Sequence, residues 1–162
     1  MTTRSAPQPD AAAACRLLAS GATFGTLATA ARDPAGHPFA TLVALAFDPR
    51  AQPLLLLSDL AEHTKNLRVD ARASLLVVDS NASSDPLAGF RMTLVGSCIE
   101  IPTDESDAAR GIYLGCHPEA ASYARFADFT LWRLDVASVR WIAGFGRMQW
   151  LSGDAYAGAK LS

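Results

Sequence analysis

The stretch "FATLVALAFDPRAQPLLLLSDLAEHTKNLRVDARASLLVVD", residues 39–79, decides the fold of this chain. Residues 39–47 are apolar apart from one Thr, and a second apolar run at residues 54–58 follows the turn-forming segment DPRAQP. Short apolar runs bounded by Pro and Asp are typical of buried β-strands. A further strand is predicted at residues 73–79, after a segment whose charged residues recur at helical spacing. The stretch therefore predicts two strands, a helix and a third strand.

The rest of the chain continues this alternation of strands, turns and helices. Strands are predicted at residues 22–30, 90–101 and 129–144, and the segment FGRMQWL that follows is also predicted to be β. Gly96 inside one of these strands predicts a bulge or a close approach of two backbones. Helices are predicted at residues 11–20, between the N-cap Asp10 and the stop signal Gly21, and in two segments broken at His117-Pro118.

These elements predict a mainly β fold with helical decoration. Six or so strands with two intervening helical segments favour a six-stranded antiparallel barrel, whose first three strands form a meander. Closure is expected because several strands are apolar on both faces. Residues 1–9 are polar and contain two prolines, so they are expected to form a flexible N-terminal arm. Residues 10–162 are expected to form a single domain.

The composition narrows the partners and the compartment. The formal net charge is −2 and the pI is about 5.8, and no basic stripe is present, so nucleic acid is not expected to bind. No apolar stretch approaches the roughly 20 residues of a membrane helix, so no membrane contact is expected. Cys15, Cys98 and Cys116 are far apart in sequence, which favours a reducing compartment and a cytoplasmic location. The scattered His and Cys residues predict no metal site.

The segment SDLAEHTKNL, residues 58–67, places polar groups at a predicted helix start. Free backbone amides and a partial positive charge at such a start attract anions. Ser58, Thr64 and Lys65 add two hydroxyl groups and an ammonium group, and His63 adds a donor when protonated, so the segment predicts a phosphate site. The alternative is that these residues only cap the helix. Lys occurs elsewhere only at position 160, whereas the other 12 basic residues are Arg.

The quoted stretch resembles the flavin-binding core of the pyridoxamine 5'-phosphate oxidase-like split-barrel flavoproteins, and SDLAEHTKNL resembles the haem-utilisation branch of that superfamily. The resemblance covers roughly residues 10–150 and implies a split β-barrel that binds FMN. By this resemblance, the flavin phosphate contacts Ser58, His63, Thr64 and Lys65. The ring and ribityl chain are implied to lie along a strand made of Ala40, Thr41, Leu42 and Val43.

The segment RWIAGFGRMQW near the C-terminus adds two further residues. Its two glycines are compatible with a simple hairpin loop, and its two tryptophans with core packing or a dimer contact. The resemblance implies instead that Trp141 lies near the flavin and that Arg147 faces the substrate. The vitamin oxidase has an alternating His and a second Arg after that Arg, where this chain has Gln149 and Leu151, so oxidation of the phosphorylated vitamin is not expected.

The sequence thus predicts an FMN-dependent flavoprotein oxidoreductase that acts on a small molecule, as a homodimer with FMN at the subunit interface. A haem-binding or haem-degrading protein is the alternative. Longer members of the haem branch carry a C-terminal domain with a histidine that resembles a haem ligand, which this sequence lacks. A flavin or haem carrier without turnover, and a deazaflavin in place of FMN, also stay open.

Overall fold

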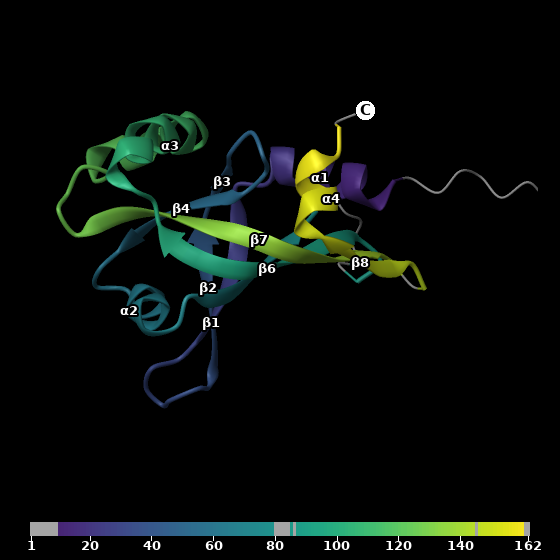
Figure 1. Cartoon of the computed structure of the whole chain (residues 1–162), viewed down its shortest axis with the longest axis horizontal. Coiled ribbons are helices and arrows are strands. Elements are labelled where there is room, and N and C mark those ends of the chain that lie inside the picture. Colours follow the sequence, from purple (N-terminus) through teal and green to yellow (C-terminus); the bar gives the residue numbers. More distant parts are fainter. Residues whose placement is uncertain (1–9, 80–84, 86, 145, 161–162) are drawn as a thin grey trace, which may run out of the picture.

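A computed structural model of the chain describes residues 10–79, 85, 87–144 and 146–160. An eight-stranded antiparallel sheet curls into a half-barrel flanked by helices (Figure 1), which confirms the expected split-barrel class. The strands are β1 (Phe24–Ala30), β2 (Pro38–Ala44), β3 (Ala46–Phe47), β4 (Pro53–Ser58), β5 (Arg72–Val78), β6 (Phe90–Glu100), β7 (Phe129–Ala143) and β8 (Met148–Ser152). The helices are α1 (Ala11–Gly21), α2 (Glu62–Val69), α3 (Thr103–Cys116), the 3₁₀ helix η1 (Pro118–Ser122) and α4 (Gly153–Gly158).

The strand number differs from the six expected. The predicted strand at residues 39–47 is interrupted at Leu45 and gives both β2 and β3, and the segment after residue 147 forms the separate strand β8. Leu45 is fully buried, and its backbone N–H donates to Thr23 O at 2.9 Å, so the chain bends inward at this point. The expected arm at residues 1–9 and most of the polar loop at 80–89 lie outside the described residues.

The sheet order is β2-β1-β5-β6-β7-β4-β3, and β8 also pairs with β7. The predicted three-strand meander is confirmed only in part: β3, the end of the predicted strand 39–47, pairs with β4, whereas β4 pairs with β7 from Leu54 to Ser58 and not with β2. The reason is burial on both faces of β4. Leu55 and Leu57 belong to one core cluster, and Leu54 and Leu56 belong to a second one. A strand that separates two cores needs the central position beside β7.

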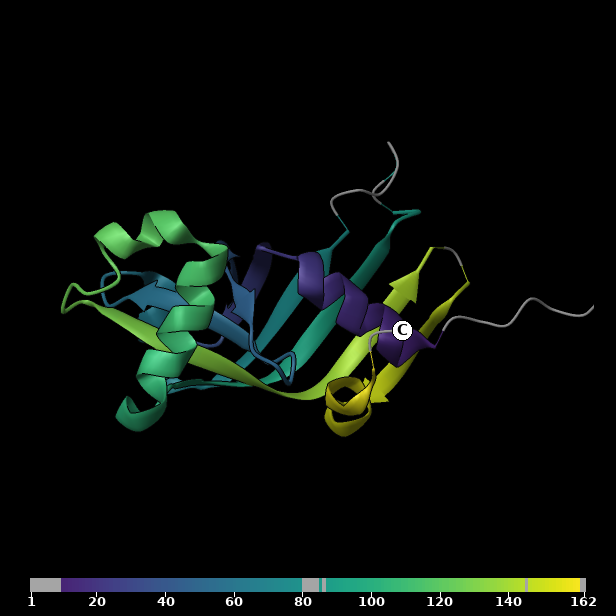
Figure 2. The same ribbon diagram turned by 90° about the horizontal axis from the view of Figure 1, so that it is seen from above.

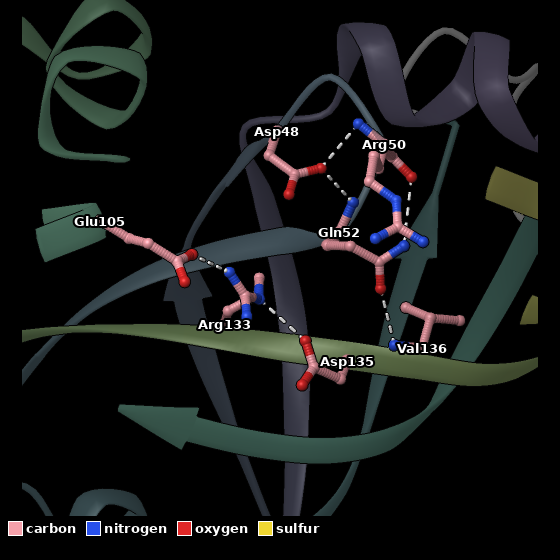
Figure 3. Close-up of polar contacts among 7 residues, drawn as sticks. All are labelled: Asp48, Arg50, Gln52, Glu105, Arg133, Asp135 and Val136. Atoms are coloured by element: carbon pink, nitrogen blue, oxygen red, sulfur yellow. Dashed lines mark hydrogen bonds and ion pairs between the residues drawn. The ribbon is translucent and has the colours of Figure 1, made fainter. Parts of the chain in front are cut away.

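Strand β7 changes its neighbour partway along one edge. It pairs with β4 as far as Arg133 and with β8 from Ser138 onward. Between these points β7 has no strand partner on this edge among the described residues. The side chain of Gln52 takes the place of one ladder hydrogen bond, since its Oε1 accepts from Val136 N at 2.7 Å (Figure 3). Arg133 adds ion pairs to Asp135 at 2.8 Å and to Glu105 of α3 at 2.7 Å. The gap between the two strand partners is therefore bridged by side chains.

The same part of β7 is approached closely by two glycines. The register of β6 against β7 shifts between Val95 and Gly96, which confirms the expected bulge. A Cβ at Gly96 would lie 2.0 Å from Asp135 O, so the expected close backbone approach is also confirmed. From α4, a Cβ at Gly153 would lie 2.1 Å from Val136 O. No side chain fits at either position without moving the backbone of β7.

The helices lie at two ends of the sheet, α3 with η1 at one end and α1 with α4 at the other (Figure 2). Helix α1 begins and ends as expected, and Asp10 Oδ1 accepts from Ala12 N at 3.0 Å. The expected break at His117-Pro118 is present, although the second segment is a short 3₁₀ helix. Helix α4 was not predicted from the sequence. Its Tyr156 hydroxyl donates to Ala51 O at 2.9 Å, which fixes the helix on the core.

Candidate functional site

Helix α2 is attached to the end of β1 by a buried amide. Asn66 is fully buried, its Nδ2 donates to Thr29 Oγ1 at 3.0 Å, and its Oδ1 accepts from Arg32 N at 3.0 Å. Both ends of this amide are therefore satisfied. Asn is a poor residue for a helix interior, so its place inside the predicted helix was a signal that the sequence analysis missed.

Four predicted site residues lie at or just before α2. Ser58 ends β4, and its hydroxyl donates to Asp128 Oδ2 at 3.2 Å and accepts from Leu60 N at 3.1 Å, so this hydroxyl organises the turn. Thr64 is fully buried, and its hydroxyl has no hydrogen-bond partner among the described residues. Lys65 is partly exposed, with Nζ 3.8 Å from a Glu62 carboxylate oxygen.

His63 joins α2 to β2. Its Nδ1 lies 3.1 Å from Thr41 Oγ1, so two predicted site residues from distant segments meet. Burial lowers the pKa of His63, because the charged imidazolium loses solvation between the helix and the strand. The ring is therefore neutral at neutral pH, and it donates from one nitrogen only.

The four predicted residues of β2 do not share one face. Successive side chains of a strand point to opposite faces of the sheet. Val43 points into the core and Thr41 on the same face reaches His63, whereas Ala40 and Leu42 are exposed on the other face. A single flat ligand on one face of β2 therefore contacts only part of the predicted set.

A carboxylate lies between two cations at the start of α2. Glu62 Oε1 is 2.9 Å from Arg32 Nε, and Glu62 Oε2 is 3.8 Å from Lys65 Nζ. Arg32 was not identified from the sequence, since it precedes a turn with no distinguishing pattern. Exposed pairs of this kind are each worth only about 0.2 to 1 kcal/mol, so Glu62 holds the two cations weakly. We call Arg32, Thr41, His63, Thr64 and Lys65 the α2 site.

Trp141 and Arg147 form a separate group. Trp141 is buried, it meets Phe90 edge to face at 5.9 Å between ring centroids, and the Arg147 guanidinium lies 5.8 Å from the centre of a Trp141 ring. Phe129, which pairs with Ser58, begins β7, whereas Trp141 lies near its end. Ser58 is therefore distant from Trp141 along β7. Thr41 of the α2 site, by contrast, is aligned across four strand spacings, roughly 20 Å, with Val139, two residues before Trp141. Within one chain, the predicted site is therefore divided into two groups.

The outer face of the sheet carries exposed apolar side chains. Cross-strand pairing places the following six residues in one continuous row, with Leu42 and Trp150 at its two ends: Leu42, Thr26, Leu76, Thr93, Arg140 and Trp150. Arg140 lies over the ring of Trp150, 5.6 Å from its centre. Phe24 and Met148 are also exposed on this side of the sheet. We call this surface the outer face; Leu42, Leu76 and Trp150 are its exposed apolar members, and Thr26, Thr93 and Arg140 lie between them, partly exposed.

The curled antiparallel sheet with flanking helices places the protein among the split-barrel proteins. Residues 6–158 match the family described as CREG, beta-barrel, so the chain belongs to that family. The atypical chloroplastic haem oxygenase HOZ of Arabidopsis thaliana is 32% identical over 129 residues, which are 80% of this chain and 39% of that protein.

Two solved structures show the same fold. A haem-binding protein from Mycobacterium smegmatis is 41% identical with a TM-score of 0.89, over 96% of this chain and 63% of that one. A protein of the pyridoxinephosphate oxidase family from Clostridium acetobutylicum is 14% identical with a TM-score of 0.68, over 91% and 99% of the two chains. This chain thus spans 39% and 63% of the length of its two more similar relatives, HOZ and the mycobacterial protein.

Two kinds of feature are absent from the described part of the chain. No helix there is long and apolar enough to cross a membrane. No group of three or more His, Cys, Asp or Glu side chains in those same residues is placed to hold a metal ion. The three cysteines are free.

Proposed function

We propose that this protein binds haem at the α2 site. The observation that carries the proposal is the meeting of two cations, Arg32 and Lys65, with the His63–Thr41 pair at one end of the sheet. Haem combines a planar ring with two anionic propionates and a metal that accepts an imidazole ligand. The names of HOZ, a haem oxygenase, and of the mycobacterial haem-binding protein support the same cofactor.

The residues present fit an anionic cofactor. The first turn of α2 offers free backbone amides and the positive end of the helix dipole. Arg32 and Lys65 provide charge, and Thr64 has a buried hydroxyl without a described partner. When bound, haem supplies an iron centre for electron transfer and oxygen chemistry. The chain's own residues bind the propionates and orient the ring against β2.

FMN is the second candidate cofactor, and with it an FMN-dependent oxidoreductase acting on a small molecule. Hydroxyl, ammonium and helix amide groups are the donors that a phosphate monoester needs, and all three are present in α2. The likeness to a member of the pyridoxinephosphate oxidase family supports the split-barrel fold on which the FMN proposal depends. A deazaflavin phosphate presents the same anionic group.

The visible absorption spectrum of the purified protein, recorded alone and after addition of haem or FMN, tests this proposal. We expect a Soret band that saturates with one haem per chain. If the protein binds FMN saturably and takes up no haem, the cofactor of the α2 site is FMN and the haem proposal is wrong. If neither compound binds, the α2 site holds no such cofactor and the proposal is wrong. Product analysis of the haem complex with an electron donor and oxygen then separates a haem-degrading enzyme from a carrier.

Lys65→Ala is expected to weaken binding of the anionic cofactor by about 1 to 3 kcal/mol, because a charge-assisted hydrogen bond is lost. Titrations with haem, and with FMN beside riboflavin, measure the effect. Lys160→Ala is the matched control, since it removes the other lysine, which lies after α4. Riboflavin has no phosphate, so its affinity is expected to stay constant. If Lys65→Ala binds haem and FMN as tightly as the unchanged protein does, Lys65 does not belong to the site.

We further propose a homodimer formed by the outer face, with a second copy of this chain as the occupant. Among the described residues, no hydrogen bond, ion pair or ring contact joins the α2 site to the Trp141–Arg147 pair within one chain, and a second copy would bring another Trp141–Arg147 pair to the cofactor. The exposed apolar side chains of Leu42, Leu76 and Trp150 in this row support the interface. In such a dimer, Arg147 of one copy faces the substrate side of the other's cofactor.

Leu42→Lys is expected to raise the dimer dissociation constant at least about tenfold, because a buried ammonium in an apolar interface is strongly unfavourable. Light scattering over a range of protein concentrations measures this change. Leu60→Lys is the matched control, because Leu60 is 77% exposed in a turn outside the outer face and Leu42 is 74% exposed. Equal dimer fractions for the two variants would exclude the outer face as the interface.

The free cysteines support a reducing compartment, and we propose a cytoplasmic location on that basis.

A further inference from the structure

The three histidines of the chain differ in what their ring nitrogens contact. His117 is 3% exposed, with Nε2 2.9 Å from Leu45 O and Nδ1 3.3 Å from Glu119 Oε1, so both nitrogens are occupied. His37 is exposed in the β1–β2 turn, where its backbone N–H donates to Pro34 O and its carbonyl accepts from Ala31 N. His63 is half-buried, and its Nδ1 contacts Thr41 Oγ1.

We infer that Nε2 of His63 is the protein ligand of the haem iron, and that the Thr41 hydroxyl holds the ring through Nδ1. This inference rests on the proposed haem function. No other described residue bonds the His63 ring, so Nε2 is the nitrogen left for a ligand. A histidine that binds a metal almost always uses its other ring nitrogen in a hydrogen bond that fixes the ring orientation.

The contact with Thr41 makes His63 better positioned than a free surface histidine. Thr41 is fixed in β2 by its register opposite Leu27 of β1, which is fully buried in the core. His63 lies in the first turn of α2, which Asn66 attaches to β1. Both partners of the 3.1 Å contact are therefore held by secondary structure. A ligand supported in this way keeps its direction, which lowers the entropy lost on binding.

The charges needed for the propionates lie close to this nitrogen. Glu62, which precedes His63, contacts both Arg32 and Lys65, so the two cations are within one helical turn of the proposed ligand. The cysteines offer no competing thiolate in the core, because burial raises the pKa of Cys15 and of Cys98 to about 12. Cys116 is exposed at the end of α3, on the opposite side of β4 from the main core.

The test uses the full chain reconstituted with haem, and compares His63→Ala with the matched control His37→Ala. We expect His63→Ala to lower haem affinity at least about tenfold, since loss of even a hydrogen-bond partner of a metal ligand typically costs about 10- to 100-fold, and to shift the Soret band. Added imidazole is expected to restore the original spectrum. His37→Ala is expected to retain both affinity and spectrum. Circular dichroism checks that each variant is folded.

Thr41→Val provides a second test that keeps the ligand. It removes the hydroxyl and nearly preserves side-chain shape, so we expect a shifted iron–histidine stretching frequency in the resonance Raman spectrum of the ferrous complex. An unchanged frequency in Thr41→Val, or an unchanged Soret band in His63→Ala, would overturn the ligand assignment while leaving haem binding intact. Failure of the unchanged protein to bind haem would instead reject the proposed function.

Discussion

Gly96→Ala is expected to lower the free energy of unfolding by more than about 3 kcal/mol, the upper end of the usual cost of overpacking. The added Cβ would lie 2.0 Å from Asp135 O and 2.9 Å from Asp135 C, and both atoms belong to the backbone of β7. That backbone is held from its other edge, since Gln52 binds Val136 N and Gly153 lies against Val136 O. The strand therefore has no free direction in which to move.

Urea denaturation followed by circular dichroism measures this loss. Gly111→Ala is the matched control, because Gly111 lies inside α3 and a Cβ there meets no atom within 4 Å. We expect this control to gain roughly 0.5 to 1 kcal/mol from the better helix propensity of Ala. If Gly96→Ala is as stable as the unchanged chain, the backbone of β7 can move away from the added Cβ, and the packing described above does not hold it in place.

Asn66→Leu is expected to cost about 4 kcal/mol of folding stability. Leu has a similar volume, but it leaves the Arg32 N–H and the Thr29 hydroxyl without their partner, and each unsatisfied buried group costs about 1 to 3 kcal/mol. The variant is also expected to bind cofactor more weakly, because the contact between α2 and β1 positions the first turn of the helix. Thermal unfolding and haem titration measure the two effects.

Thr64→Val in the same helix is the control for Asn66→Leu. Thr64 is equally buried, but its hydroxyl has no described partner, so its loss is expected to leave folding stability unchanged or slightly higher. If Asn66→Leu were no more destabilising than Thr64→Val, the buried amide would not be what holds α2 in place.

Local patterns predicted most of the elements, and the structure explains why. The first helix, the helix after residue 58 and the bulge at Gly96 all depend on neighbouring residues, whose propensities agree with the fold. Helix α4 was missed because it is short and contains two glycines, and packing through Tyr156 stabilises it more than propensity does.

The predicted site was less complete because it depends on contacts between distant segments. The pairing of Thr41 with His63 joins two residues that the sequence had assigned to different parts of a cofactor. Arg32 reaches the site only because β1 ends beside α2, which no local pattern indicates. The pairing of β4 with β7 could not be predicted for the same reason. Sequence periodicity indicates which face of a strand is buried, but not which strand lies beside it.

The pairing of β4 with β7 also affects the order of events during synthesis. Ser58 pairs with Phe129, and Asp59 N donates to Asp128 O at 2.7 Å, so the turn before α2 is supported by residues made much later. A nascent chain that has not yet reached Asp128 lacks the partners of Ser58 and Asp59, although those of His63 and Asn66 are already made. Because domains fold as units during translation, cofactor loading must follow release of the last third of the chain from the ribosome.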